Sequence, residues 1–251
     1  MFPIRDHNPS LRTPYVTWAL IAINVLVFLS YVGLFESDVR LAAFYDDWAL
    51  TPAKLMAGRG WETLITSMFL HGGWMHIAGN MLFLWIFGDN LEDCFGHVRF
   101  LLFYLACGVA AALAQVIPDP GSTVPMVGAS GAIAGVMGGY LLLFPRARVD
   151  VIVIIVIIIR MFTLPAWVML GFWFGLQTVS GVINLSAEGG GVAYLAHVGG
   201  FVAGVALTLP WFLRAGGTAY WKRNQGHPPH PAAPPLKQRK SSIPTVRRRR
   251  R

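Results

Sequence analysis

The chain has 251 residues, of which 55% are hydrophobic and only 13% are charged. Soluble domains carry about 25% charged residues, so this composition excludes an ordinary soluble protein. The formal net charge of +8 reflects an excess of Lys and Arg that is concentrated between and after the apolar segments, on one side of the predicted membrane. No nucleic-acid partner is needed to explain it.

Six apolar segments are each long enough to cross a bilayer core of about 30 Å as a helix. They predict an all-α polytopic membrane protein, a six-transmembrane-helix bundle with a long outer loop between helices 1 and 2. The chain divides into an N-terminal segment (1–14), the helical domain (15–213) and a C-terminal tail (214–251). The predicted spans are 15–34, 74–91, 98–117, 126–144, 165–184 and 192–213.

The distribution of basic residues predicts the orientation of this bundle. With six spans, one side of the membrane carries 17 of the 20 Lys and Arg residues. Basic residues concentrate on the cytoplasmic side of membrane proteins, so both termini are predicted to be cytoplasmic. The segments on this side are 1–14, 89–99, 145–164 and 214–251.

Three segments outside the spans have distinct compositions. The outer connection, residues 35–73, contains several Trp and Tyr residues and is expected to rest on or partly in the outer leaflet. Residues 151–159, VIVIIVIII, are too few to span as a helix; they predict a buried strand or an interfacial hairpin, with extension of a neighbouring span as the alternative.

The C-terminal tail is rich in Pro, Lys and Arg and lacks apolar periodicity, so it is predicted to be disordered. Its five terminal arginines are able to contact anionic lipid. The alternative is a solvated tail that only helps to set the topology.

Polar residues inside spans mark functional sites by default, because burying them in lipid is costly. Ser130 lies in the fourth span, His197 in the sixth, and His76 and Asn80 in the second. His76 and Asn80 are four residues apart and therefore share a helix face. The simpler alternatives are a serine that bonds to its own helix backbone and an asparagine that bridges two helices.

Small residues surround both Ser130 and His197 on helical wheels. In the fourth span Gly131, Gly135 and Gly138 leave one helix side almost without side chains, and the sixth span has a similar face that includes Gly200. Small faces let membrane helices approach closely. Packing the two spans together would bring Ser130 close to His197.

A serine beside a neutral imidazole is an activated nucleophile, because the imidazole accepts the hydroxyl proton. No Asp or Glu lies in the fourth or sixth span, so the sequence predicts a Ser130–His197 dyad without an acidic third member. The Ser130 backbone N–H, the Asn80 amide and the His76 imidazole are candidate donors for an oxyanion. A zinc site from His71, His76 and His197 is the alternative. We expect no metal, because the spacing of His71 and His76 is not that of helical zinc ligands.

These motifs resemble those of the rhomboid intramembrane serine proteases over about residues 15–213. The resemblance rests on HGGWMHIAGN (71–80), GASG (128–131) and AHVGG (196–200). It implies that Ser130 is the nucleophile and His197 the general base. Asn80 and His76 resemble the residues that stabilise the transition state, and His71 resembles a support for the outer loop.

The resemblance also identifies Gly128, Gly131 and Gly200 as structural neighbours of the site, and Glu92-x-x-x-Gly96 as a structural pattern at the cytoplasmic end. One position departs from the family pattern. Ala134 stands where an aromatic residue commonly packs on the histidine, so another group must orient His197.

The function implied is cleavage of transmembrane helices of other proteins, near the outer face of a cell membrane, with a bacterial inner membrane expected. The bilayer and these protein substrates are the expected partners, and no cofactor is implied. The fifth span and residues 184–191 are the expected gate. The alternatives are a noncatalytic chaperone that binds membrane-protein clients and, disfavoured by the lack of an internal repeat, a small-molecule transporter.

Overall fold

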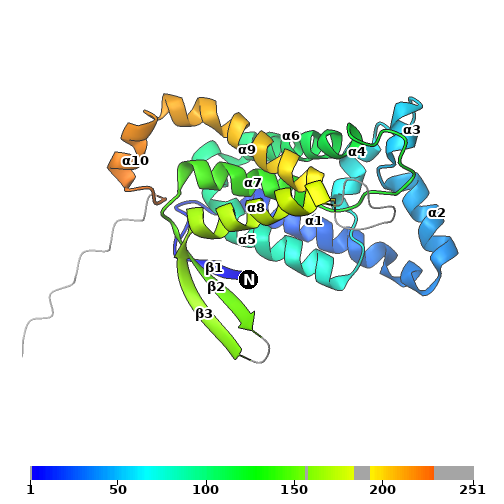
Figure 1. Ribbon diagram of the computed structural model, residues 1–251, viewed down its shortest axis with the longest axis horizontal. Helices are drawn as coiled ribbons and strands as arrows, with labels where there is room; N and C mark the ends of the chain where they lie inside the picture. The colour runs from blue at the N-terminus through cyan, green and yellow to red at the C-terminus, as the bar shows by residue number, and fades with distance from the viewer. Residues whose placement is uncertain (1, 156–157, 184–192, 229–251) are drawn as a thin grey trace, which may run out of the picture.

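The structure is a computed structural model that describes residues 2–155, 158–183 and 193–228, and most of these residues are helical (Figure 1). The helices are α1 (Tyr15–Tyr31), η1 (Val32–Glu36), α2 (Asp38–Trp48), α3 (Pro52–Met56), α4 (Thr63–Thr66), η2 (Ser67–Phe69), α5 (Trp74–Phe95), α6 (His97–Val116), α7 (Ser130–Leu143), α8 (Ala166–Ile183), α9 (Tyr194–Arg214) and α10 (Thr218–Asn224). The strands are β1 (Phe2–Asp6), β2 (Arg148–Ile155) and β3 (Ile158–Pro165).

Four helices in the described part of the chain are long and apolar enough to cross a membrane. They are α1 extended by η1, α6, α8 and α9. Helix α7 is apolar but shorter, and α5 carries three acidic residues near its C-terminal end. The connection between α1 and α5 is folded into the short helices η1, α2, α3, α4 and η2, and α2 and α3 lie at the end of the molecule opposite α10 (Figure 1).

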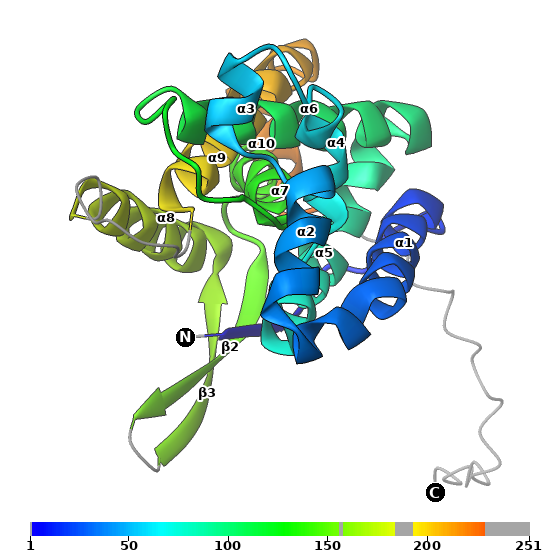
Figure 2. The same ribbon diagram turned by 90° about the vertical axis from the view of Figure 1, so that its right-hand side faces the viewer.

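Helix α7 occupies the centre of the bundle, surrounded by α5, α6, α8 and α9 (Figure 2). The predicted span 126–144 is wrong at its N-terminal end, because the helix begins only at Ser130. Before it the backbone is extended, and Met126 exchanges two hydrogen bonds with Leu50. Gly128 then takes φ 132°, a conformation that side chains disfavour, and turns the chain into the helix.

The contact between α7 and α9 is a backbone contact, as the small faces of the two helices predict. A Cβ added at Gly200 would overlap the carbonyl oxygen of Gly131, and a Cβ at Gly204 would overlap that of Gly135. No side chain larger than hydrogen fits at these two positions without separating the helices. The glycine spacing thereby sets the distance between α7 and α9.

A three-stranded antiparallel sheet in the order β1-β2-β3 lies at one end of the helix bundle. The distribution of Lys and Arg predicts that this end faces the cytoplasm. Residues 151–159 were predicted to form a buried strand or an interfacial hairpin, and those of them that the structure describes belong to β2 and β3, which pair antiparallel. β1 was not predicted. The buried Asp150 carboxylate accepts hydrogen bonds from Thr163, His7 and Arg5 and so joins all three segments. These donors hold the pKa of the Asp150 carboxyl well below its usual range.

A second carboxylate, Glu92 at the end of α5, holds the start of α1. It accepts hydrogen bonds from the backbone N–H groups of Val16 and Thr17, from the Thr17 hydroxyl and from His97. Gly96 follows with φ 76° and lets the chain turn directly into α6. The Glu92-x-x-x-Gly96 pattern therefore joins three helix ends at one point.

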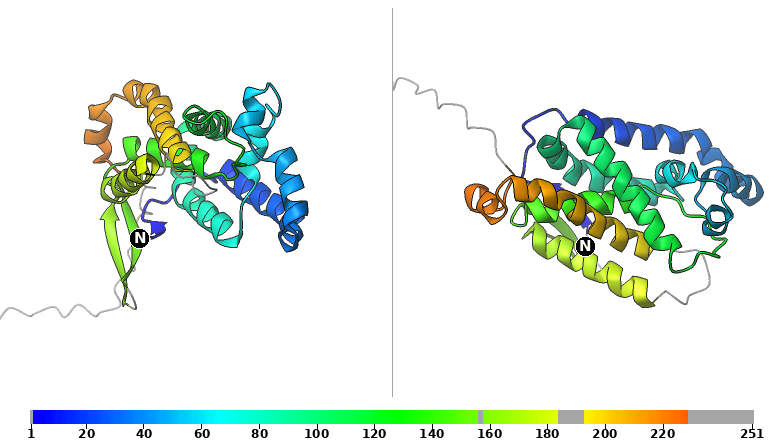
Figure 3. Two further views of the ribbon diagram at one scale, coloured as in Figure 1. Left: turned by 45° about the vertical axis from the view of Figure 1, so that its right-hand side comes forward. Right: turned by 90° about the horizontal axis from the view of Figure 1, so that it is seen from above.

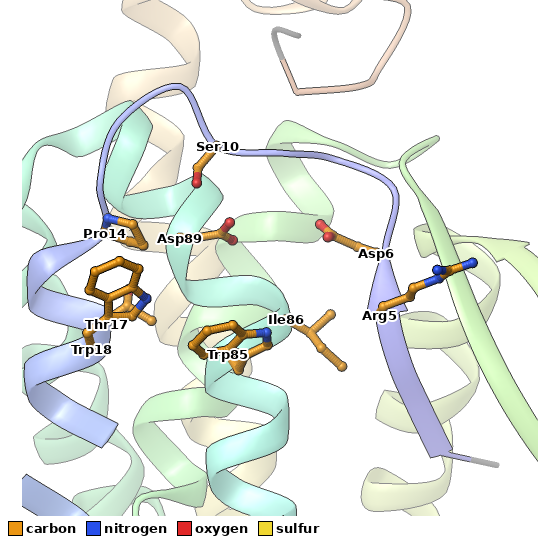
Figure 4. Close-up of a pocket in the computed structure, with 9 residues that line it drawn as sticks. All are labelled: Arg5, Asp6, Ser10, Pro14, Thr17, Trp18, Trp85, Ile86 and Asp89. Carbon is orange, nitrogen blue, oxygen red and sulfur yellow. The ribbon is translucent and has the colours of Figure 1, made fainter. Parts of the chain in front are cut away.

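Between α1, α5 and the N-terminal segment lies a cavity of about 260 Å³ (Figure 4). Figure 4 shows the carboxylates of Asp6 and Asp89 pointing toward each other across this cavity. The rings of Trp18 and Trp85 also line the cavity and lie below the two carboxylates in this view. Burial raises the pKa of the Asp6 carboxyl.

The disorder predicted for the C-terminal tail is wrong for Thr218–Asn224, which form α10. Aromatic contacts order this helix, because Tyr220 packs on Trp211 and the Trp221 ring N–H donates to the Leu142 carbonyl oxygen. Residues 229–251, which include the five terminal arginines, lie outside the described residues.

We expect Gly200→Val to lower both stability and activity, since the added side chain collides with the α7 backbone. Overpacking of this kind costs about 1–3 kcal/mol, and more where backbone must move. The measurement is the Tm of the purified protein in detergent. Gly171→Val on α8 is the matched control, because a Cβ at Gly171 meets no atom within 4 Å. Equal Tm values for the two variants would contradict the α7–α9 contact.

Candidate active site

Ser130 is the first residue of α7 and is half-buried where the segment 126–129 meets the helix. The Gly128 backbone N–H, which donates to the Ser67 carbonyl oxygen, fixes this junction to η2. The N–H groups of a first helical turn have no partner within their own helix, and they carry partial positive charge. The Ser130 backbone N–H is therefore one of the donors at this junction.

His197 lies in the first turn of α9 and is buried, with 9% of its surface exposed. Its Nε2 atom is 2.8 Å from the Ser130 Oγ atom, which is a hydrogen-bond distance. The glycine contact between α7 and α9 brings the two residues together, because it begins at Gly131, the residue after Ser130, and at Gly200, three residues after His197. A hydroxyl next to an imidazole nitrogen is the arrangement that general-base activation requires.

Two residues of α8, which the sequence analysis missed, hold the other side of His197. The Gln177 Oε1 atom lies 2.7 Å from His197 Nδ1, and the Trp173 ring packs over the imidazole with a centroid distance of 5.8 Å. Position 134, where an aromatic residue was expected to pack on the histidine, is occupied by the fully buried Ala134. Gln177 and Trp173 contact the imidazole instead. Gln177 could have been found by the rule that flagged Ser130, since it is a polar residue inside a predicted span.

His76, in the first turn of α5, lies beside the Gly128 backbone that leads into Ser130. A Cβ at Gly128 would lie 2.9 Å from His76 Nε2 and 3.5 Å from Ser130 Oγ, so both side chains border the Gly128 backbone. The Gly72 backbone N–H donates to His76 Nδ1 at 3.2 Å. The His76 ring therefore presents its Nε2 edge toward the serine.

Asn80 is buried one turn after His76, with 8% of its surface exposed. Within the described residues its Nδ2 atom has no hydrogen-bond partner, so it donates to neither Ser130 nor His197. A buried amide donor without a partner is costly, and such groups are kept where they bind a ligand or a reacting group.

His71 lies outside the serine–histidine pair and is completely buried. The Tyr31 hydroxyl donates to its carbonyl oxygen at 2.8 Å, and Tyr45 donates to the same oxygen at 3.3 Å. The His71 ring packs edge-on against His76 with a centroid distance of 5.1 Å. This residue therefore links the α1–α5 connection to the His76 ring.

A cavity of about 40 Å³ lies beside Ser130, between the start of α7 and α6. Its lining is mainly apolar and includes Met68, Ala111 and Ala196, with Ser67 as a polar neighbour. The volume accommodates one water molecule. Among the described residues, no group of three or more His, Cys, Asp or Glu side chains is arranged to hold a metal ion.

The architecture and the site together define a membrane-embedded helix bundle with a serine–histidine pair inside it. The family model described as the rhomboid domain matches residues 58–214. The chain belongs to the rhomboid family and is an integral membrane protein.

Three relatives illustrate the range of this similarity. Rhomboid protease GluP of Bacillus subtilis is 34% identical over 205 residues, which are 78% of this chain and 36% of that protein. Rhomboid protein 1, mitochondrial, of Saccharomyces cerevisiae is 29% identical over 196 residues, 76% of this chain and 51% of its own. Presenilin-associated rhomboid-like protein, mitochondrial, of Homo sapiens is 26% identical over 208 residues, which are 82% of this chain and 49% of that protein. The chain thus spans between a third and a half of the length of these relatives.

Proposed function

We propose that the protein is an intramembrane serine endopeptidase that cleaves transmembrane segments of other membrane proteins. The observation that carries this proposal is the 2.8 Å contact between Ser130 Oγ and His197 Nε2 inside a bundle of apolar helices. Membership of the rhomboid family and the similarity to a relative named as a protease support it.

In this mechanism Ser130 Oγ attacks the scissile carbonyl carbon while His197 Nε2 takes the hydroxyl proton. His197 then gives the proton to the leaving amine, which departs and leaves an acyl group on Ser130. Water, activated by the same imidazole, hydrolyses this ester and restores the serine. The developing oxyanion accepts hydrogen bonds from the Ser130 backbone N–H, the Asn80 amide and His76. Each of these groups is neutral, which suits a site surrounded by lipid.

The proposed topology has six crossings, formed by α1, α5, α6, α7, α8 and α9, with both termini in the cytoplasm of a cell membrane. Helix α7 has 14 residues, a length of about 21 Å at 1.5 Å per residue. It is shorter than a bilayer core of about 30 Å, so Ser130 lies below the outer surface, in a site open to the outer side.

The substrate helix must unwind before its peptide bond reaches Ser130, because helical hydrogen bonds protect the backbone. The loop expected to act as a gate, residues 184–191, lies outside the described residues. Contact between the arginine-rich tail and anionic lipid stays a prediction for the same reason.

We expect Ser130→Ala and His197→Ala each to remove nearly all cleavage of a transmembrane substrate. The double variant should be no less active than either single variant, since residues that act as one unit are not additive. Covalent labelling by a fluorophosphonate, which reacts with activated serines, should likewise be lost. Ser30→Ala is the control, because this exposed serine on α1 donates to its own helix backbone at Val27. Labelling that persists in Ser130→Ala would rule out Ser130 as the nucleophile and favour a noncatalytic protein that binds clients.

Asn80→Ala should slow turnover while leaving the nucleophile reactive, since Asn80 stabilises charge and exchanges no proton. Loss of one oxyanion donor costs about 10²–10³ in kcat in soluble serine proteases. We expect about 10² or less here, because the Ser130 N–H and His76 partly compensate. The measurements are turnover and the rate of fluorophosphonate labelling, with the Tm confirming that the variant is folded. Turnover equal to wild type would make Asn80 a packing residue only.

A further inference from the structure

The proposed mechanism requires His197 to keep one particular proton. Nε2 must be unprotonated to accept the Ser130 hydroxyl proton, so Nδ1 must carry the ring proton in the resting state. A neutral imidazole in an apolar site exchanges between two tautomers unless one ring N–H has a dedicated acceptor. In soluble serine proteases a buried aspartate accepts this N–H.

The acceptor in this protein comes from α8. Gln177 Oε1 lies 2.7 Å from Nδ1 on the side of the ring opposite Ser130. The amide must present its oxygen, because its NH₂ group could not accept the Nδ1 proton. Gln177 is half-buried and belongs to a helix that packs along α9, as the view from above shows (Figure 3).

Trp173 adds a second constraint one helical turn before Gln177. Its ring is tilted by 33° to the imidazole at a centroid distance of 5.8 Å, and it also contacts the Phe201 ring on α9 at 6.3 Å. The indole limits rotation of the imidazole out of its plane, while the amide limits rotation within the plane. Residues 173 and 177 lie four apart, so both act from the same face of α8.

We infer, on the basis of the proposed function, that Gln177 is the positioning residue of the serine–histidine pair. It holds the tautomer in which Nε2 is the base, and Trp173 holds the ring plane. The amide fulfils the orienting role of a triad aspartate without placing a charge in the bilayer. The catalytic unit is thereby assembled from three helices, with Ser130 on α7, His197 on α9 and Gln177 on α8.

The test compares three variants of the full chain in detergent. Gln177→Leu keeps the approximate size of the side chain and removes the acceptor, whereas Gln177→Glu keeps an acceptor. Thr178→Val is the matched control, because the Thr178 hydroxyl donates to the Phe174 carbonyl oxygen of its own helix, and among the described residues it has no hydrogen bond to the site. Steady-state kcat and KM are measured with a transmembrane substrate.

We expect Gln177→Leu to lower kcat about 10- to 100-fold, part of the 10²–10⁴ that general-base catalysis supplies. KM should stay within about twofold, because Gln177 acts through His197 and not on the substrate. Gln177→Glu should recover most of the lost kcat, and Thr178→Val should match wild type. A Gln177→Leu variant with wild-type kcat, or with no greater loss than Thr178→Val, would overturn the inference.

A second measurement does not depend on activity. Nitrogen-15 NMR of histidine-labelled protein, with His197 assigned by comparison with His197→Gln, reports which ring nitrogen carries the proton. Wild type should show protonated Nδ1 and free Nε2, and Gln177→Leu should show a mixture. Unchanged tautomer populations would overturn the positioning role even if the protease function stands. Absence of Ser130-dependent turnover in wild type would instead overturn the function and leave the tautomer result to decide the positioning role.

Discussion

The close approach of α7 and α9 is the constraint on which the rest of the structure depends. Gly131 meets Gly200 and Gly135 meets Gly204 so closely that the two backbones touch. This contact puts a serine and a histidine within hydrogen-bond distance. Ala134 on α7 offers the imidazole no aromatic ring, and the imidazole is held from a third helix, α8, by Trp173 and Gln177.

The two ends of the bundle use different kinds of polar interaction. Around Ser130 the interacting groups are hydroxyl, imidazole and amide, none of which needs a permanent charge. At the opposite end of α7, Asp150 joins the three segments of the sheet, and Glu92 at the end of α5 joins α1, α5 and α6 through carboxylate hydrogen bonds. Carboxylates are tolerated where water and basic residues are close, so the ionic interactions fasten the helix ends while neutral ones form the site.

Much of this arrangement could be predicted from the sequence, because it follows from regular spacing. The small faces of α7 and α9 repeat with the period of a helix, and they predicted that Ser130 and His197, polar residues inside apolar spans, would lie close together. The apolar run 151–159 was too short for a span, and its described residues belong to the antiparallel strands β2 and β3.

Features that depend on partners distant in the chain could not be predicted in this way. β1 has a partner about 145 residues away, α10 is ordered by the aromatic rings of α9, and α7 begins at Ser130 because Met126 pairs with Leu50. The polarity of Gln177 inside a span marks it as a candidate, but its partner, His197, follows only from the position of α8 beside α9.

The sheet has a consequence for the order of assembly during synthesis. Arg5 and Asp150 are separated by 145 positions, which corresponds to roughly 7–30 s of translation at 5–20 residues per second. β1 therefore waits without its partner while α1, α5, α6 and α7 emerge, and it pairs only after α7 has been made. Pairing of β1 therefore comes after the synthesis of α1, α5, α6 and α7, so the sheet cannot hold the N-terminal segment in place while these four helices are being made.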